Sequence, residues 1–151
     1  MKTRNFRDLI VWQRSMALTR ECYALAGRLP PEERFALASQ LRRAAVAVSA
    51  NIAEGHASPH RREFVRYLGI AHASLMELEC HLLIMVDVGY LGQDAITECL
   101  ALRDEVGRML HAMRRTLSDR SPHRSALPAD RRSGDAAQHT ARRNCSQSRI
   151  G

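Results

Sequence analysis

The stretch FVRYLGIAHASLMELECHLLIM, residues 64–85, contains the strongest pattern in this sequence. Its apolar residues recur at alternating steps of four and three, which places them on one face of an α-helix. A helix with one apolar face must bury that face against other elements, so the stretch predicts a helical bundle. The residues of this face are Phe64, Leu68, Ala71, Leu75, Leu78, Leu82 and Met85.

Three further segments have helical periodicity, and turn-forming residues separate them. The first covers about residues 7–29 and is followed by two prolines, which stop a helix. The second covers residues 31–55, and Gly55 is expected to end it in a left-handed conformation. Ser58 is expected to be the N-cap of the long third helix, and the fourth helix covers about residues 96–117.

Four helices with short connections predict an all-α fold, namely an up-down-up-down antiparallel four-helix bundle without β-strands. The bundle is expected to cover residues 1–119. Beyond Asp119 the helical pattern is lost, and seven arginines stand against two aspartates. Residues 120–151 are therefore predicted to be a disordered basic tail.

The composition resembles that of an ordinary globular domain, with 45% hydrophobic and 26% charged residues. The four cysteines are far apart and form no CxxC pair, so we expect reduced thiols and no zinc site. Lys2 and Arg4 stand where a signal peptide needs an apolar run. The longest uncharged helical stretch, residues 44–53, is too short to span a bilayer. We therefore expect a cytoplasmic protein without membrane association.

The sequence lacks the usual patterns of catalytic and metal sites. A di-iron site in a four-helix bundle needs Glu-x-x-His pairs, and none of the seven histidines has a glutamate three positions before it. Glu77 and His81 share a helix face, but one such pair is more typical of a surface hydrogen bond than of a metal site. No phosphate-binding loop, GxSxG or HExxH motif occurs. We expect no enzymatic activity, no cofactor and no metal.

Several short stretches carry a family resemblance: LIVW at 9–12, QLRRAA at 40–45, SANIAEG at 49–55, IAHASLMELE at 70–79 and GYL at 89–91. They resemble the four-helix-bundle family of proteins encoded within intervening sequences of 23S ribosomal RNA genes. The resemblance implies a ring-like homopentamer. One branch of that family is the accessory variability determinant of diversity-generating retroelements, which binds a reverse transcriptase and nucleic acid.

Two stretches, residues 44–50 and 82–86, are apolar on more than one side of their helices. A monomeric bundle buries one stripe per helix, so these stretches favour self-association, and close helix packing through alanines is the alternative. Asn51 lies on the same stripe and is expected to have a structural role in a polar seam. The predicted interface residues are Ala44, Ala47, Val48, Leu83 and Val86.

An alternating bundle also brings the N-terminus, the connection between the second and third helices, and the end of the fourth helix together. We call this end the basic pole. Guanidinium groups hold phosphate oxygens well, so the pole predicts a surface that binds the backbone of RNA or DNA. Solvated arginines that pair with neighbouring acids are the alternative. The cations of the pole are Lys2, Arg4, Arg7, Arg61, Arg62, Arg66, Arg114 and Arg115.

The sequence therefore predicts a non-enzymatic, homo-oligomeric adaptor that binds nucleic acid through its basic pole. The alternative is a protein-binding scaffold or an accessory subunit, for example of a reverse transcriptase, without direct nucleic acid contact. Few aromatic residues lie near the pole, so base-specific recognition of single strands is not expected. A steep salt dependence of binding would separate the two classes.

Overall fold

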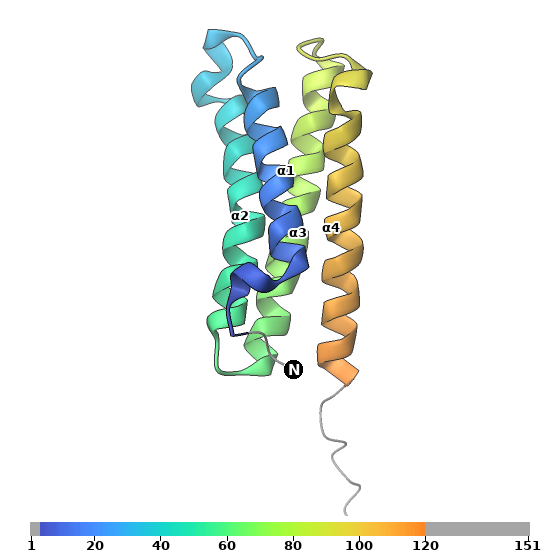
Figure 1. Ribbon diagram of the computed structural model, residues 1–151. Coiled ribbons are helices and arrows are strands. Elements are labelled where there is room, and N and C mark those ends of the chain that lie inside the picture. The colour runs from blue at the N-terminus through green and yellow to red at the C-terminus, as the bar shows by residue number, and fades with distance from the viewer. Residues whose placement is uncertain (1–3, 120–151) are drawn as a thin grey trace, which may run out of the picture. The chain divides into compact units, whose positions relative to one another are not determined.

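The computed structural model describes residues 4–119, which contain four α-helices and no strand (Figure 1). The predicted all-α fold is confirmed. The predicted tail, residues 120–151, and Lys2 lie outside the described residues. The elements are the 3-10 helices η1 (Phe6–Asp8) and η2 (Pro31–Phe35) and the helices α1 (Ile10–Ala26), α2 (Leu37–Ala57), α3 (Arg61–Asp87) and α4 (Gln93–Asp119).

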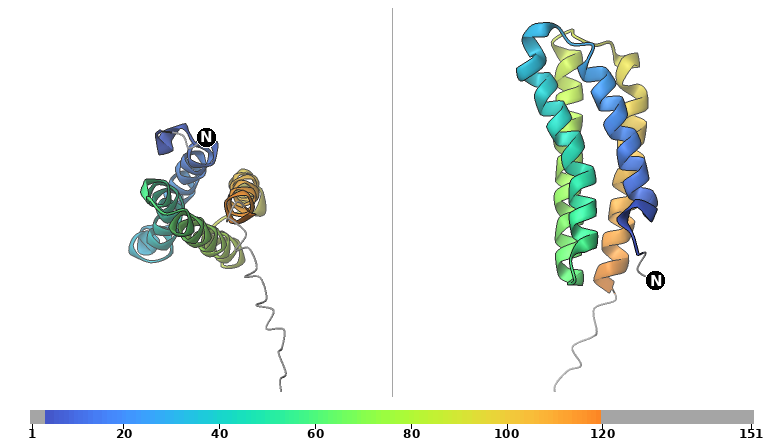
Figure 2. Two further views of the ribbon diagram at one scale, coloured as in Figure 1. Left: turned by 90° about the horizontal axis from the view of Figure 1, so that it is seen from below. Right: turned by 60° about the vertical axis from the view of Figure 1, so that its left-hand side comes forward.

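Successive helices run in opposite directions, and each helix packs against two others (Figures 1 and 2). The contacts form a closed cycle in which α1 meets α2, α2 meets α3, α3 meets α4 and α4 meets α1. The most extensive packing joins α2 and α3. The predicted up-down-up-down order is confirmed, so the start of α1, the α2–α3 turn and the end of α4 lie at one end of the bundle.

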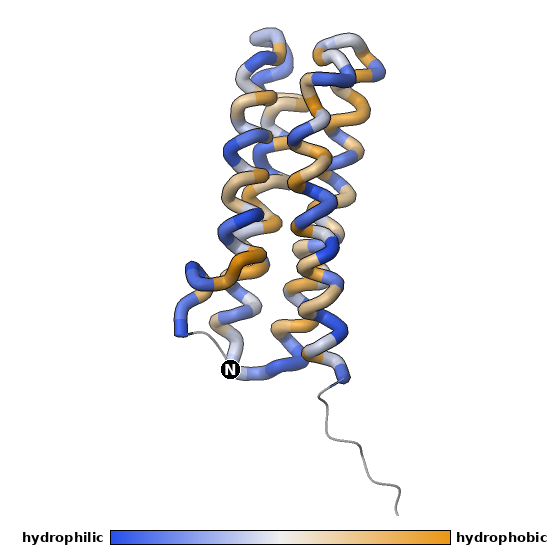
Figure 3. Tube along the Cα trace, turned by 45° about the vertical axis from the view of Figure 1, so that its right-hand side comes forward, coloured by the Kyte–Doolittle hydropathy of each residue, from blue (hydrophilic) through white to orange (hydrophobic). Residues whose placement is uncertain are grey.

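The core consists mainly of aliphatic side chains from all four helices. Hydrophobic and hydrophilic residues alternate along the helices (Figure 3), as one-sided burial requires. The predicted stripe of α3 is buried over its whole length, from Phe64 to Met85. By length and composition α3 also meets the description of a membrane-spanning helix. In the bundle, 33% of the apolar window of this helix is buried.

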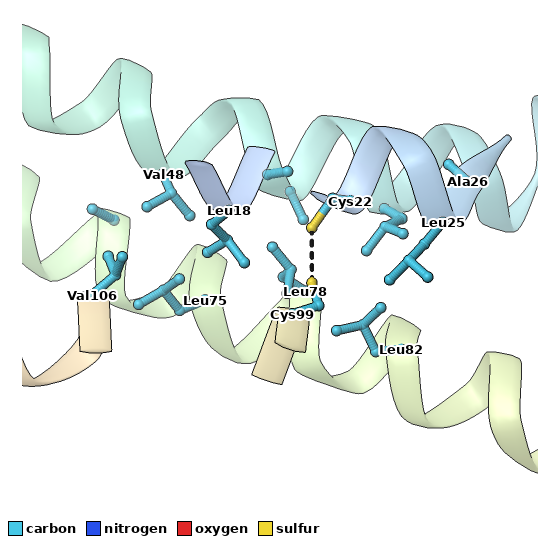
Figure 4. Close-up of a cluster of buried hydrophobic side chains, with 14 of the residues drawn as sticks. Leu18, Cys22, Leu25, Ala26, Val48, Leu75, Leu78, Leu82, Cys99 and Val106 are labelled. Atoms are coloured by element: carbon cyan, nitrogen blue, oxygen red, sulfur yellow. Dashed lines mark hydrogen bonds between the residues drawn. The ribbon is translucent and has the colours of Figure 1, made fainter. Parts of the chain in front are cut away.

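Polar contacts and one thiol pair join different helices of the bundle. Arg14 in α1 donates to Glu105 in α4 at 2.5 Å, and Arg103 in α4 pairs with Glu79 in α3. Inside the core, the Sγ atoms of Cys22 and Cys99 lie 3.5 Å apart (Figure 4). The hydrogen bond with Cys99, together with burial, raises the pKa of Cys22 above its ordinary value, which keeps this residue a neutral thiol.

Several predicted helix ends were wrong. The first helix was expected over about residues 7–29, but its start is the separate turn η1 and α1 ends at Ala26. The second was expected from Pro31, but residues 31–35 form η2 and α2 begins at Leu37. The carboxylate of Glu33 accepts a hydrogen bond from the Leu37 backbone N–H at 3.1 Å. This side chain satisfies one of the unpaired donors at the start of α2.

Gly55 does not end α2, because the helix continues to Ala57. The reason lies in the neighbouring helix. A Cβ atom at Gly55 would lie 2.7 Å from the Cβ of Tyr67 and 2.8 Å from the Cδ2 of Phe64. Gly55 is therefore a site of close approach between α2 and α3, and its missing side chain is what allows it.

Ser58 is not the N-cap of α3, because the helix starts at Arg61 and His60 occupies the cap position. Ser58 instead orders the turn before the helix. Its Oγ accepts a hydrogen bond from the His60 backbone N–H at 3.3 Å and donates one to the Glu63 carboxylate at 2.5 Å. The side chain therefore links the α2–α3 turn to the first turn of α3.

Candidate nucleic-acid interface

The fold brings the segments that carry the predicted cations of the basic pole to one end of the bundle (Figure 1). Arg4 lies just before η1 and Arg7 lies within it. The other five lie in the first turns of α3 or the last turns of α4, and are Arg61, Arg62, Arg66, Arg114 and Arg115. The predicted placement is therefore correct for every cation of the pole within residues 4–119, and Lys2 lies outside them.

Three of these arginines line one groove between the start of α3 and the end of α4. Arg62 and Arg66 stand on successive turns of α3, and Arg114 approaches from α4. The groove has a volume of about 880 Å³. Its remaining lining residues are His60, Glu63, Val65 and Gly69.

The positive charge in this groove is poorly compensated. Within residues 4–119, the ion pairs of arginine involve Arg14 and Arg103, and none involves the three arginines of the groove. The carboxylate of Glu63 also lines the groove, but it accepts the hydrogen bond from Ser58. The buried Nε of Arg114 has no hydrogen-bond partner among the described residues. These arginines therefore retain donors for an added anion.

The aromatic side chains near the pole are engaged in other contacts. Phe64 is buried, and Phe6 packs edge-on against Trp12 with ring centroids 5.1 Å apart. The guanidinium of Arg66 lies 4.6 Å from the ring centroid of Tyr67. With its aromatic rings engaged in this way, the pole offers cationic groups but few rings on which bases could stack. Cationic groups are what contacts to a phosphate backbone require.

A family model described as 23S rRNA-intervening sequence protein matches residues 7–112. The chain belongs to this family. A solved structure similar to it is that of a protein with unknown function from the S23 ribosomal protein family of Bacteroides thetaiotaomicron, with a TM-score of 0.64 and 22% identity. The alignment covers 69% of this chain and 97% of that chain, and at this identity it shows a shared fold. No curated protein matches the sequence.

In this 23S rRNA-intervening sequence protein, the predicted interface residues divide into two groups. Ala44 and Val48 are 2% and 0% exposed, so they belong mainly to the core of the single chain, although Ala44 also lines the groove that contains Ala47. Ala47 is half-buried and lines a groove of about 420 Å³ on the outer side of α2. Leu83, which is 47% exposed, and Val86 line a groove of about 570 Å³ along α3. These three residues remain available for an interface.

Asn51 forms no polar seam between helices in this member of the family. Its Nδ2 donates to the backbone oxygen of Ala47, one turn earlier in α2, at 2.7 Å. Ser74 likewise donates to Ile70 within its own helix, at 3.1 Å. The Ser74 hydroxyl and one N–H of the Asn51 amide therefore bond to the backbone of their own helices.

The described part of this family member contains no group of three or more His, Cys, Asp or Glu side chains that could hold a metal ion. Glu77 Oε1 lies 3.5 Å from His81 Nε2, one turn away on α3. That distance is long for a hydrogen bond, and two side chains alone do not complete a metal site.

Gly69 is a groove residue that the sequence pattern did not reveal. A Cβ atom there would lie 3.8 Å from the Cζ of Arg114, so the guanidinium occupies the space beside the glycine. Glycine is unfavourable in the middle of a helix, by about 1 kcal/mol relative to alanine. A glycine in the most regular helix of the chain was therefore the one feature of the sequence that could have indicated a special role for this position.

Proposed function

We propose that this 23S rRNA-intervening sequence protein is a non-enzymatic, homo-oligomeric adaptor whose basic pole binds the backbone of RNA or DNA. The observation that carries the proposal is the groove of Arg62, Arg66 and Arg114, whose charge has no acidic partner within residues 4–119. Guanidinium groups bind phosphate oxygens in a forked geometry and remain charged at every physiological pH. A polyanion would supply the missing negative charge.

Exposed apolar side chains on the outer faces of α2 and α3 support the homo-oligomeric part of the proposal. Val46 on α2 and Met76, Leu83 and Ile84 on α3 are all exposed in the single chain. Apolar surface of this kind gains free energy when a second subunit covers it. The family resemblance implies a pentameric ring. A ring with parallel subunits would repeat the basic pole and raise the avidity for a polyanion.

Replacing both Arg61 and Arg62 with glutamate is expected to weaken nucleic acid binding about equally for all sequences. Each lost phosphate contact lowers the slope of log affinity against log salt by about 0.9 for duplex DNA, so the loss of two contacts should flatten it by about 2. Fluorescence anisotropy with unrelated labelled oligonucleotides across a salt series measures both quantities. Circular dichroism should show unchanged helicity, because both side chains are exposed.

The double variant Arg42→Glu and Arg43→Glu is the matched control for this experiment. Both residues also line the groove that contains Ala47, so light scattering must show an unchanged mass for this variant. It makes the same change of charge on α2, away from the pole, where the Arg42 guanidinium lies 5.7 Å from the Tyr23 ring centroid. If this variant abolishes binding while the Arg61 and Arg62 variant binds normally, the contact runs along the side of the bundle. The basic pole would then be the wrong surface.

Replacing Ala47 with glutamate is expected to dissociate the oligomer. A carboxylate buried at a subunit interface would lose its hydration at a cost of several kcal/mol by order of magnitude, and pairing with Arg43, one turn earlier, would offset only part of that cost. Light scattering or sedimentation should give a mass near five chains for the natural protein and a smaller mass for the variant. Ala101→Glu, on the exposed side of α4, is the control. A natural protein that is monomeric at micromolar concentration contradicts the homo-oligomeric proposal.

A second candidate function is that of a protein-binding scaffold, such as an accessory subunit of a reverse transcriptase. The groove of about 570 Å³ along α3 favours it, because Met76, Leu83 and Ile84 give the groove apolar walls. Binding of a protein through apolar contacts would vary little with salt concentration, whereas phosphate contacts give a steep slope. The salt series therefore distinguishes the two functions.

A further inference from the structure

We infer that the groove between the start of α3 and the end of α4 is a discrete phosphate-binding site, in which Arg62, Arg66 and Arg114 clamp the oxyanion. The inference rests on the proposed function, because it names the place on the basic pole where a nucleic acid backbone is held. Its ligand class is a phosphodiester or a polyphosphate. At such a site, binding depends on the shape of the groove as well as on its charge, whereas a diffuse attraction to the basic pole depends on charge alone.

Without a bound anion, the three arginines of the groove repel one another, which is unfavourable for the stability of the protein. Arg62 and Arg66 are four residues apart on α3, so their Cβ atoms are about 5–6 Å apart, and like charges at this spacing destabilise a helix. Arg114 adds a third positive charge from α4. An anion bound between the three guanidinium groups attracts each of them, and this attraction offsets their mutual repulsion.

One acid, Glu63, lines the groove and offsets part of its positive charge. Glu63 lies between the two α3 arginines in sequence, and its carboxylate accepts the 2.5 Å hydrogen bond from Ser58 in the α2–α3 turn. The structure gives Glu63 no ion pair with Arg62, Arg66 or Arg114 within residues 4–119. Three arginines therefore stand against one carboxylate, which leaves the groove with an excess of positive charge.

Gly69 forms the floor of the site. Its missing Cβ would lie 3.8 Å from the Cζ and Nη2 atoms of Arg114 and 3.9 Å from Nε, so the guanidinium rests against the backbone of α3. The buried Nε of Arg114 has no acceptor among the described residues. From Arg62 to Gly69 the groove follows α3 for about 10 Å, which gives room for a phosphate group and its neighbours.

The decisive experiment changes the shape of the groove without changing its charge. Gly69→Leu fills the floor and displaces the Arg114 guanidinium, so it is expected to weaken binding of a fluorescein-labelled oligo(dT) by about tenfold or more, the loss expected for one charge-assisted hydrogen bond. Gly69→Ala adds one methyl group in ordinary contact with Arg114 and is expected to weaken binding much less. Both residues favour helix more than glycine does, so the fold should persist, which thermal unfolding checks.

A second pair of variants keeps the test valid if Gly69→Leu fails to fold. Arg114→Gln removes a charge from inside the groove, and Arg115→Gln removes the same charge from the next position, which does not line the groove. We expect about a tenfold loss for the first and no more than about a threefold loss for the second. All variants are measured in the full chain by anisotropy with oligo(dT) and by calorimetry with inorganic tripolyphosphate.

The outcomes separate this inference from the proposed function. If Arg114→Gln and Arg115→Gln weaken oligo(dT) binding equally and Gly69→Leu has no effect, the discrete site is refuted and the basic pole stands. If tripolyphosphate binds with the expected dependence on Gly69 and Arg114 but oligo(dT) does not bind, the phosphate site stands and the proposed function is refuted. Binding of neither ligand by the natural protein overturns both.

Discussion

Replacing Leu78 with alanine is expected to lower the free energy of unfolding by about 3 to 5 kcal/mol, because the change leaves a cavity in the centre of the bundle. Leu78 is 0% exposed and lies among Leu18, Leu75 and the Cys22–Cys99 pair (Figure 4). A domain of this size has about 5–15 kcal/mol of stability in total. The variant should therefore unfold at a much lower urea concentration, followed by far-ultraviolet circular dichroism.

Ile10→Ala is the control for the Leu78 variant. Ile10 is the first residue of α1 and is 59% exposed, so removing a similar number of carbon atoms there should change stability by no more than about 0.5 kcal/mol. A loss of less than about 1 kcal/mol for Leu78→Ala would contradict the burial of the α3 stripe.

Gly55→Ala is expected to lower the free energy of unfolding by about 1 to 2 kcal/mol, and Gly55→Leu by considerably more. The added Cβ would meet Tyr67 and Phe64 at 2.7 and 2.8 Å, so α2 and α3 must move apart. Alanine gains up to about 1 kcal/mol over glycine from its helix propensity, but overpacking costs about 1–3 kcal/mol. Because α2 and α3 form the most extensive helix contact, the separation also disturbs the residues around it.

Gly107→Ala makes the same substitution in α4 without the close approach. Its added Cβ would lie 3.8 Å from the Cδ1 of Leu75, an ordinary contact, so this variant should gain up to about 1 kcal/mol. Opposite signs for the two variants in parallel urea titrations would confirm the explanation. If Gly55→Ala is also stabilising, the close approach of α2 and α3 does not explain this glycine.

The existence and order of the four helices could be predicted because helical periodicity is a local property of the sequence. The helix ends could not, since they depend on contacts between distant residues. Gly55 resembles a helix terminator in sequence, yet the approach of Tyr67 and Phe64 explains it. Ser58 resembles an N-cap, yet its hydroxyl binds Glu63 and leaves the cap position to His60.

The location of the basic pole followed from topology alone, since alternating helices bring known segments together. Its groove did not, because the sequence gives no distance between Arg114 and the α3 arginines. The prediction of the subunit interface also depended on distances between helices that the sequence does not give. Ala44 and Val48 lie in a stretch that is apolar on more than one side, but α2 packs against both α1 and α3 and so buries a wide face. Part of the second apolar side of α2 therefore belongs to the core of the single chain.

The opposite end of the bundle carries Arg28 and Arg34 against a larger number of acids, which are Glu32, Glu33, Asp87, Asp94 and Glu98. With the basic pole at the other end, each bundle is an electric dipole along its long axis. Two such dipoles side by side repel when they point the same way, and salt screens this repulsion within about 10 Å at 0.1 M. Assembly of parallel subunits should therefore strengthen with added salt while nucleic acid binding weakens. A polyanion across the basic poles would remove the repulsion, so binding and assembly would promote each other.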